Sequence, residues 1–307
     1  MKLFNNIVSF FSHRNPSVAG VALVLGGGGA RGFAHIGAIE VLREHGYPIL
    51  SLAGTSMGAL VGGLYAAGKM DEMKEMAHDL TRMKTFKLMD FSPGLNHLAS
   101  GERFEALLHR LLGDLCIQQL PIPFACVASD VVSGHQKVFT DGPLALAIRA
   151  SVSIPCFFKP VEQHGHLYVD GSVHDTLPLD VVKRSAGDVL VAVNASAPDA
   201  RECRWFSSDG TAARGNMSWW KRSLPLFKAG LADNSLSMAV RVAGLSVQQN
   251  TLMALRITPP ELCVDVPMDR FGLFDFAKAD EIIAYGREQT ECLLKAHGPL
   301  LAVHKDM

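Results

Sequence analysis

The sequence predicts an α/β fold. Two stretches, 18–45 and 48–67, each combine a short apolar run, a glycine-containing turn and a segment with helical spacing. The first apolar run, 18–25, is continuous and rich in β-branched residues, as is typical of a strand buried on both faces. A further run of this kind lies at 188–194. With 307 residues, 48% of them apolar and 19% charged, the chain has enough core material for one large domain.

Net charge, cysteine distribution and apolar runs indicate which partners and which cellular compartment to expect. The formal net charge of -1 provides no field that would attract nucleic acid, so we expect no nucleic-acid partner. Six scattered cysteines, without Cys-x-x-Cys pairs, predict buried thiols in a reducing compartment and no metal site. We also expect no cofactor. No apolar segment reaches the roughly 18 residues that a membrane span needs, so we expect a cytoplasmic protein. Apolar residues in the tail, 1–17, would allow peripheral membrane contact; a frayed tail docked on the body is the alternative.

A glycine-rich loop, 26–32, joins the first strand to the first helix. Its backbone N–H groups, next to a helix N-terminus, would stabilise negative charge, and three interpretations compete. Gly27, Gly29 and Gly32 match the dinucleotide pattern G-x-G-x-x-G, but the acidic residue expected after the second strand is replaced by a serine motif. A P-loop would need Gly-Lys-Ser/Thr at the end of the run, which is missing. The third interpretation is an oxyanion hole, with amide donors aimed at the charge that develops on an ester carbonyl.

The serine motif, Gly54-Thr-Ser-Met-Gly58, follows the second apolar run and precedes a helical segment. Strand, Gly-x-Ser-x-Gly and helix form the context of a nucleophile elbow. Gly54 and Gly58 remove Cβ atoms that would clash in so sharp a turn, and Ser56 is presented at the positive end of the helix. An ordinary turn with a serine N-cap is the alternative. Because the oxyanion hole alone explains why a serine elbow follows, the two motifs together favour acyl transfer.

Helices and strands continue to alternate beyond the elbow. Residues 70–89 have helical spacing, and the apolar face that includes Met73, Met76 and Met83 would line an acyl-chain groove or, more commonly, face the core. The other predicted elements are a loop at 91–101, a helix at 102–112, strands at 123–129 and 134–140, a helix at 143–150 and a proline-containing connection at 151–160.

A carboxylate ends the next predicted strand, 166–170. Asp170 closes this strand and Gly171 makes the turn, so that Asp170 would face the same site as Ser56. The alternative is a solvated turn aspartate, the common fate of Asp-Gly. Near the glycine loop, Arg31 could hold a phosphate head group, but a structural pairing is the simpler explanation for Arg31 and also for His35, and we assign catalysis to neither.

The chain resembles the bacterial patatin-like phospholipases, and the resemblance extends from about residue 18 to 183. It is carried by four motifs in order: Gly-Gly-Gly-Ala-Arg-Gly at 27–32, Gly-Thr-Ser-Met-Gly at 54–58, Ser-Val-Ser-Ile-Pro at 151–155 and Asp170-Gly171. The resemblance implies a three-layer α/β/α sandwich with a mostly parallel central sheet. It also implies a dyad in which Ser56 is the nucleophile and Asp170 the general base. The remaining site residues would be an oxyanion hole at Gly27, Gly28 and Gly29 and turn-supporting glycines at Gly32, Gly54, Gly58 and Gly171. Expected substrates are phospholipids or other acyl esters, cleaved without a metal.

Two positions depart from the family pattern. Ser172 follows Asp170-Gly171 where glycine or alanine is usual, and His174-Asp175 stands where asparagine is common. Neither departure removes a reacting group. A triad through His174 or His297 is the alternative to the dyad, because both histidines follow Asp170 in the chain. A direct contact between the serine and the carboxylate requires a partly dry site, in which the carboxylate becomes a better base.

We expect a tail at 1–17 and one catalytic domain at 18–307. Its parts would be a motif-bearing core at 18–184, a loop at 195–226 and a helical part at 229–307. The loop holds all three tryptophans and suits a lid or an interfacial patch, since tryptophan prefers the membrane–water boundary; an insertion packed on the body is the alternative. The predicted elements here are a short helix at 178–185, the strand at 188–194, a long helix at 229–249, a strand at 251–257 and a closing helix at 277–296.

These features predict a lipid acyl hydrolase of the phospholipase A type that works through an acyl–Ser56 intermediate. A non-lipid serine esterase or thioesterase with the same site is one alternative. A regulatory binding protein with a lipase-like fold is the other.

Overall fold

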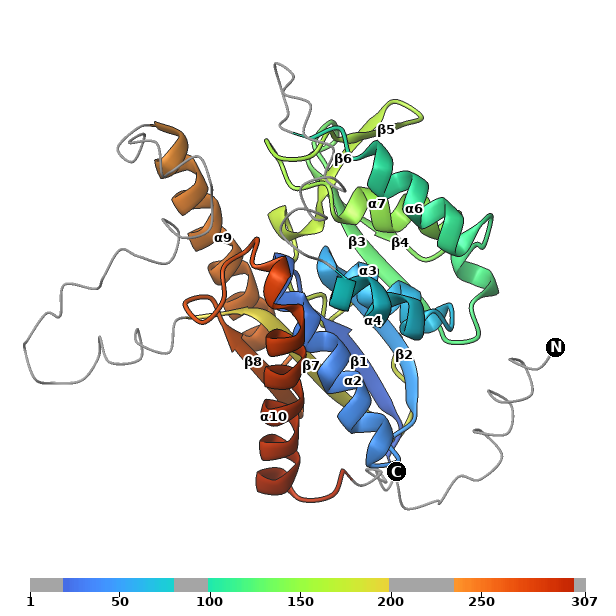
Figure 1. Ribbon diagram of the computed structural model, residues 1–307, viewed down its shortest axis with the longest axis vertical. Coiled ribbons are helices and arrows are strands. Elements are labelled where there is room, and N and C mark those ends of the chain that lie inside the picture. The colour runs from blue at the N-terminus through green and yellow to red at the C-terminus, as the bar shows by residue number, and fades with distance from the viewer. Residues whose placement is uncertain (1–18, 80–98, 199–234, 301–307) are drawn as a thin grey trace, which may run out of the picture.

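The structure, a computed structural model, describes residues 19–79, 99–198 and 235–300 (Figure 1). The described strands form one eight-stranded sheet in the order β5-β6-β3-β2-β1-β7-β8, with β4 also paired to β3. The strands are β1 Val21–Leu25, β2 Ile49–Thr55, β3 Phe124–Asp130, β4 His135–Phe139, β5 Val161–Gln163, β6 His166–Asp170, β7 Val189–Ala197 and β8 Leu262–Pro267.

The centre of the sheet is parallel and its β3 side is antiparallel. Strand β1 pairs in parallel with β2 and β7, β2 with β3, and β7 with β8, whereas β4 and β6 run antiparallel to β3. All five residues of β1 are buried, as its uninterrupted apolar run predicts for a strand covered on both faces. The mostly parallel sheet expected from the sequence is therefore confirmed.

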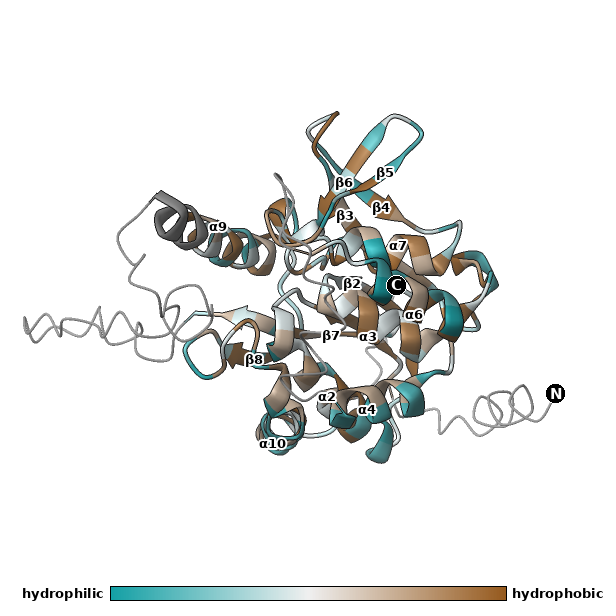
Figure 2. Ribbon diagram, turned by 45° about the horizontal axis from the view of Figure 1, so that its top comes forward, coloured by the Kyte–Doolittle hydropathy of each residue, from teal (hydrophilic) through white to brown (hydrophobic). Residues whose placement is uncertain are grey.

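Helices cover both faces of this sheet. The helices are α2 Ala34–Glu44, α3 Met57–Ala66, α4 Met70–Asp79, α6 Glu102–Leu112, α7 Leu144–Ser151, α9 Ser235–Ile257 and α10 Ala279–His297, with 3-10 turns η1 Gly29–Phe33, η2 Ile117–Gln119, η3 Gly171–Val173 and η6 Phe276–Lys278. Alternate residues of β1 belong to two separate cores. Leu23 packs in the larger core with α2, α3 and α10, and Val24 packs in a smaller one with the segment 177–182 and the end of α9. Figure 2 shows α9 on one side of the sheet and α2, α4 and α10 on the other, which confirms the three-layer sandwich.

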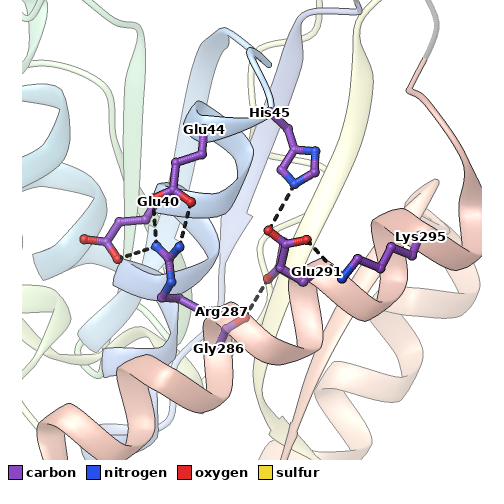
Figure 3. A network of polar contacts seen from close by, with 8 residues as sticks. Glu40, Glu44, His45, Gly286, Arg287, Glu291 and Lys295 are labelled. Carbon is purple, nitrogen blue, oxygen red and sulfur yellow. Dashed lines mark hydrogen bonds and ion pairs between the residues drawn. The ribbon is translucent and has the colours of Figure 1, made fainter.

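Helices α2 and α10 approach each other closely through two glycines. A Cβ on Gly37 would lie 2.2 Å from Ile283 O, and a Cβ on Gly286 would lie 2.2 Å from Ala34 O. Charged residues surround this contact: Arg287 of α10 binds two carboxylates of α2, those of Glu40 and Glu44, and His45 and Lys295 contact Glu291 (Figure 3). This packing attaches the C-terminal helix to the first helix.

Several predicted elements differ in the structure. Residues 251–257, predicted as a strand, are the end of α9, where Thr251 Oγ1 donates to Val247 O as in a continuous helix. Residues 178–185, predicted as a short helix, form turns, and Leu179 and Val182 of this segment pack in the smaller core. Strands β5 and β8 were not predicted, and β7 continues through Ala197, which shortens the expected loop.

The methionine side chains of α4, the described part of the predicted helix at 70–89, point into the core. Met73 is fully buried and Met76 packs against the same core, which favours the core interpretation over an acyl-chain groove for this part. The tail at 1–17, Met83 and the tryptophan-containing part of the loop lie outside the described residues. Within the described ranges, no helix is both long and apolar enough to traverse a bilayer.

Candidate active site

Ser56 occupies a strained turn between β2 and α3. Its φ of 55° and ψ of -121° lie in a region that residues other than glycine rarely adopt. Two glycines make the turn sterically feasible: a Cβ on Gly54 would lie 2.5 Å from the Gly58 carbonyl carbon, and one on Gly58 would lie 1.9 Å from Leu25 O. The turn therefore has the tight geometry that the Gly-x-Ser-x-Gly motif predicts, with Gly54 and Gly58 in the supporting positions.

Sheet register brings Asp170 to this turn. Thr55, the last residue of β2, pairs with Val127, and Asp170, the last residue of β6, pairs with Ala128. Since β4 occupies the other edge of β3 over this length, β2 and β6 follow one another along the same edge. The ends of two strands that are far apart in sequence thus meet at adjacent positions of β3.

The serine hydroxyl donates directly to the carboxylate. Ser56 Oγ lies 2.5 Å from Asp170 Oδ2, and the backbone N–H of Ser172 donates to Asp170 Oδ1 at 2.8 Å. The two side chains are buried, with Ser56 5% and Asp170 4% exposed. Burial raises the pKa of Asp170, although the hydrogen bonds from Ser56 and Ser172 oppose the shift. A carboxylate in this environment is a stronger base than one in water.

The glycine loop lies against the serine, but its amides differ. A Cβ on Gly27 would lie 2.3 Å from Ser172 Oγ and 3.4 Å from Ser56 Cβ, so this glycine lets the loop approach both the serine turn and the turn after Asp170 closely. The Gly27 N–H already donates to Thr176 O at 2.9 Å. Gly28 is the N-cap and Gly29 the first residue of η1, and within the described residues no hydrogen bond is found for the N–H groups of these two glycines.

Gly32 and Gly171 occupy close contacts of the same site. A Cβ on Gly32 would lie 2.3 Å from Met57 Cγ, in the side chain that follows Ser56. A Cβ on Gly171 would lie 2.3 Å from Val127 O, so the turn after the carboxylate packs directly on β3. At both positions a side chain would have to displace its neighbours, and the supporting roles of the two glycines stay predictions.

Arg31 and His35 have structural partners. Arg31 is buried and its Nε donates to Ala195 O at 2.7 Å, which holds β7 against the loop. His35 Nε2 is 2.8 Å from Gly26 O, and burial lowers the pKa of His35 to about 4, so the ring is neutral and donates there. These contacts agree with the structural roles expected from the sequence.

The two histidines of the alternative triad lie elsewhere. His174 is exposed and its Nε2 contacts Gly134 O at 3.1 Å. His297 is exposed at the end of α10. In the part of the chain that the structure describes, no histidine is hydrogen-bonded to Ser56 or Asp170. The described ranges also contain no group of three or more potential metal ligands.

Sequence reasoning missed two buried serines that contact the site. Ser151 Oγ accepts the backbone N–H of Ser56 at 2.8 Å, and Ser153 O accepts the backbone N–H of Asp170 at 2.8 Å. Both residues belong to the Ser-Val-Ser-Ile-Pro motif. The motif itself is visible in the sequence, but no neighbouring residue indicates which groups its two serines contact.

The family model for patatin-like phospholipases matches residues 23–183. An uncharacterized NTE family protein of Mycobacterium tuberculosis is 42% identical over 199 residues, which is 65% of this chain and 55% of that protein. Patatin-like phospholipase domain-containing protein 7 of Rattus norvegicus is 30% identical over 289 residues, 91% of this chain and 20% of the rat protein. The chain thus spans about half of the mycobacterial relative and a fifth of the rat one. The solved structure of VipD from Legionella pneumophila covers 92% of this chain and 67% of VipD, at 14% identity and a TM-score of 0.45.

Proposed function

The chain belongs to the patatin-like phospholipase family, and from this premise we propose that it is a lipid acyl hydrolase of the phospholipase A type. Membership supports lipid hydrolysis as the general activity. The observation that carries the specific proposal is the 2.5 Å contact between Ser56 Oγ and Asp170 Oδ2 in a buried site. A serine hydroxyl is a weak nucleophile until a neighbouring base accepts its proton, and this carboxylate is the group positioned to do so.

The reaction proceeds in two half-reactions. Asp170 takes the Ser56 proton while Oγ attacks the ester carbonyl carbon, and the carbonyl oxygen becomes an oxyanion. The ester C–O bond then breaks, the leaving alcohol takes the proton from Asp170, and an acyl–Ser56 ester remains. Water attacks this ester with Asp170 again as the base, which releases the fatty acid and restores the serine hydroxyl.

Gly28 and Gly29 supply the oxyanion donors in this proposal. Their N–H groups are free of partners among the described residues, whereas the Gly27 N–H is bound to Thr176 O. Gly27 instead allows the close approach of the loop to the site, because a Cβ there would meet Ser172 Oγ at 2.3 Å. Backbone donors of this kind stabilise charge that develops only in the transition state.

Exposed valines beside the site favour a lipid substrate over a water-soluble ester. Val173, three residues after Asp170, is 49% exposed, and Val131 and Val132 of the β3–β4 turn are 51% and 64% exposed. The turn is joined to this segment through the His174–Gly134 contact. Val131 N donates to Leu167 O, three residues before Asp170 on β6, and Val173 is the one of the three valines that follows the carboxylate in the chain. Exposed apolar residues along β6 and the turn after it suit contact with a lipid surface, which is where a phospholipid ester is found.

Active-site labelling tests the proposal. A fluorophosphonate probe is expected to label the wild type on the Ser56 peptide, and Ser56→Ala is expected to remain unlabelled and to release no fatty acid from phosphatidylcholine vesicles. The binding-protein alternative predicts no label on the wild type. Hydrolysis of p-nitrophenyl butyrate without hydrolysis of any phospholipid would identify a non-lipid esterase.

A further inference from the structure

The end of α7 contacts both members of the Ser56–Asp170 pair through residues two positions apart. Ser151 Oγ accepts the backbone N–H of Ser56, and Ser153 O accepts the backbone N–H of Asp170, each at 2.8 Å. Both serines are fully buried. Because one short segment holds the backbone of both residues, it fixes the separation of the hydroxyl and the carboxylate.

Ser151 makes a two-sided contact. Its Oγ accepts the Ser56 N–H and donates to Val127 O at 2.6 Å, so its single proton and an acceptor site are both used. Val127 is the β3 residue that pairs with Thr55, next to the partner of Asp170. The hydroxyl therefore ties the strained turn to the strand from which both catalytic positions are aligned.

Ser153 is held in place by a buried arginine. Arg149, 3% exposed, donates from Nη1 to Ser153 Oγ at 2.6 Å and from Nη2 to Ser100 O and Lys159 O at 3.1 and 3.0 Å. Ser153 Oγ in turn donates to Arg149 O at 2.7 Å. These bonds hold the backbone at the end of α7 in place. They therefore also hold Ser153 O, which accepts the backbone N–H of Asp170.

We propose that Ser151 is a positioning residue for the reaction, whose hydroxyl holds Ser56 in its strained conformation and thereby keeps Oγ on the Asp170 carboxylate. The inference rests on the proposed function. Ser151 does not touch the reacting atoms; it acts through the Ser56 amide. Without the hydroxyl, the Ser56 N–H loses its buried acceptor and Val127 O loses one donor, and we expect the turn to relax away from the carboxylate.

Ser151→Ala tests the proposal against a matched control. Ser51 is also a buried serine, lies on β2 and donates to a backbone carbonyl, that of Lys183, so Ser51→Ala removes a comparable bond away from the site. We expect both variants to lower Tm. Only Ser151→Ala is expected to lower kcat for p-nitrophenyl butyrate and the rate of fluorophosphonate labelling, by about 10- to 100-fold with KM little changed, as for a misplaced reacting group.

Two further variants keep the test decisive if Ser151→Ala folds poorly. Ser151→Cys retains the volume but replaces the oxygen acceptor with a weak one, and should show the same kinetic loss with a smaller change in Tm. Ser151→Thr retains the hydroxyl and should recover most of the rate. Hydrogen exchange of the Ser56 amide should be slow in the wild type and in Ser51→Ala, and faster in Ser151→Ala.

The outcomes separate this inference from the proposed function. A wild type that is labelled on Ser56, with Ser151→Ala and Ser151→Cys labelled at the same rate, would overturn the positioning role and leave the proposed function standing. A wild type that is neither labelled nor active would overturn both.

Discussion

Ser56 has a strained backbone conformation, which the residues around it must stabilise. A residue other than glycine at φ 55° and ψ -121° costs about 1–3 kcal/mol relative to an ordinary conformation. The Gly54 and Gly58 contacts and the Ser151 hydroxyl together maintain it. The result is a hydroxyl held on a buried carboxylate before substrate arrives.

Asp170→Asn is expected to raise stability while it removes activity. Burial raises the pKa of Asp170, so the folded state disfavours the ionised carboxylate relative to the unfolded chain. The sign follows: above the raised pKa, ionised Asp170 destabilises the fold, and this penalty disappears as the pH falls and the folded carboxyl binds its proton. We expect the variant to have the higher Tm at pH 8, with a smaller advantage at pH 5.

Thermal unfolding of the two proteins at both pH values measures this. Asp141→Asn, at an exposed carboxyl outside the proposed site, serves as the control. A Tm of Asp170→Asn below that of the wild type at pH 8 would show that the ionised carboxylate is a net stabiliser of the fold.

Ser56 and Asp170 could be predicted as a pair from the sequence because each lies in a motif with turn glycines, and the structure brings the two side chains into contact. The sequence could not show that the Gly27 amide is occupied, because the partner, Thr176 O, comes from a segment about 150 residues away. The partners of Ser151 and Ser153 are hidden for the same reason. Which hydrogen bonds a residue makes across the sheet depends on register, which the sequence does not state.

At the scale of elements, α3 must pass very close to the end of β1. We expect Gly58→Ala to destabilise the protein by more than about 3 kcal/mol, because its Cβ would overlap Leu25 O and a backbone atom cannot move aside. Gly62→Ala is the matched control in the same helix. Its Cβ would lie 3.3 Å from side-chain atoms of Leu25 and Phe124 that can adjust, so its effect should stay within about 1 kcal/mol. Urea unfolding of the two variants measures the difference, and equal losses would refute the close approach.

The contact between α2 and α10 depends on its glycines more than on its ion pairs. Gly286→Ala should lower Tm more than Arg287→Ala, because the added Cβ would meet Ala34 O at 2.2 Å and force the helices apart. Arg287 is 35% exposed, and solvent screens its bonds to Glu40 and Glu44 (Figure 3). Added salt should shrink the Arg287→Ala loss and leave the Gly286→Ala loss unchanged. The reverse order of Tm values would make the ion pairs the main attachment.

Elements with a strong local pattern were predicted and those set by tertiary context were not. Strand β1, with five buried apolar residues, was predicted, and so was α2, with its helical spacing. Residues 251–257 begin and end with β-branched side chains, which indicated a strand, but they continue a helix of 23 residues. Strand β8 alternates between buried and partly exposed residues and is formed by pairing with β7, for which nothing local gives the register.

At the scale of the whole molecule, both halves of the chain build the site. The family model ends at residue 183, yet β7 lies beside β1 in the sheet, and Ala195 O accepts from Arg31 in the glycine loop. Helix α9 is linked to the segment after Asp170, since Asn250 Nδ2 donates to Val173 O at 3.2 Å. The segment that follows the matched region therefore supports the proposed oxyanion loop and flanks the carboxylate.

The apolar surface near the site is expected to bind lipid vesicles. Leu245 of α9, five residues before Asn250, is 52% exposed. Ile257, the last residue of α9, is 74% exposed and lies on the far side of Asn250, where the chain leads into β8. Leu245→Glu should weaken binding to phosphatidylcholine vesicles and slow phospholipid hydrolysis, with turnover of p-nitrophenyl butyrate unchanged. Ile257→Glu, the control, should bind as the wild type does. Co-sedimentation with vesicles measures this, and equal binding by all three proteins would exclude this end of α9 from the lipid contact.

The most direct test of the account compares the carboxylate with the histidines. The measurement is kcat/KM for p-nitrophenyl butyrate in Asp170→Asn and in the double variant His174→Ala/His297→Ala. Loss of the general base should lower kcat/KM by about 10²- to 10⁴-fold in Asp170→Asn, whereas the histidine variant should retain the wild-type value. An Asp170→Asn protein that keeps most of its turnover, beside a histidine variant that loses it, would contradict the dyad.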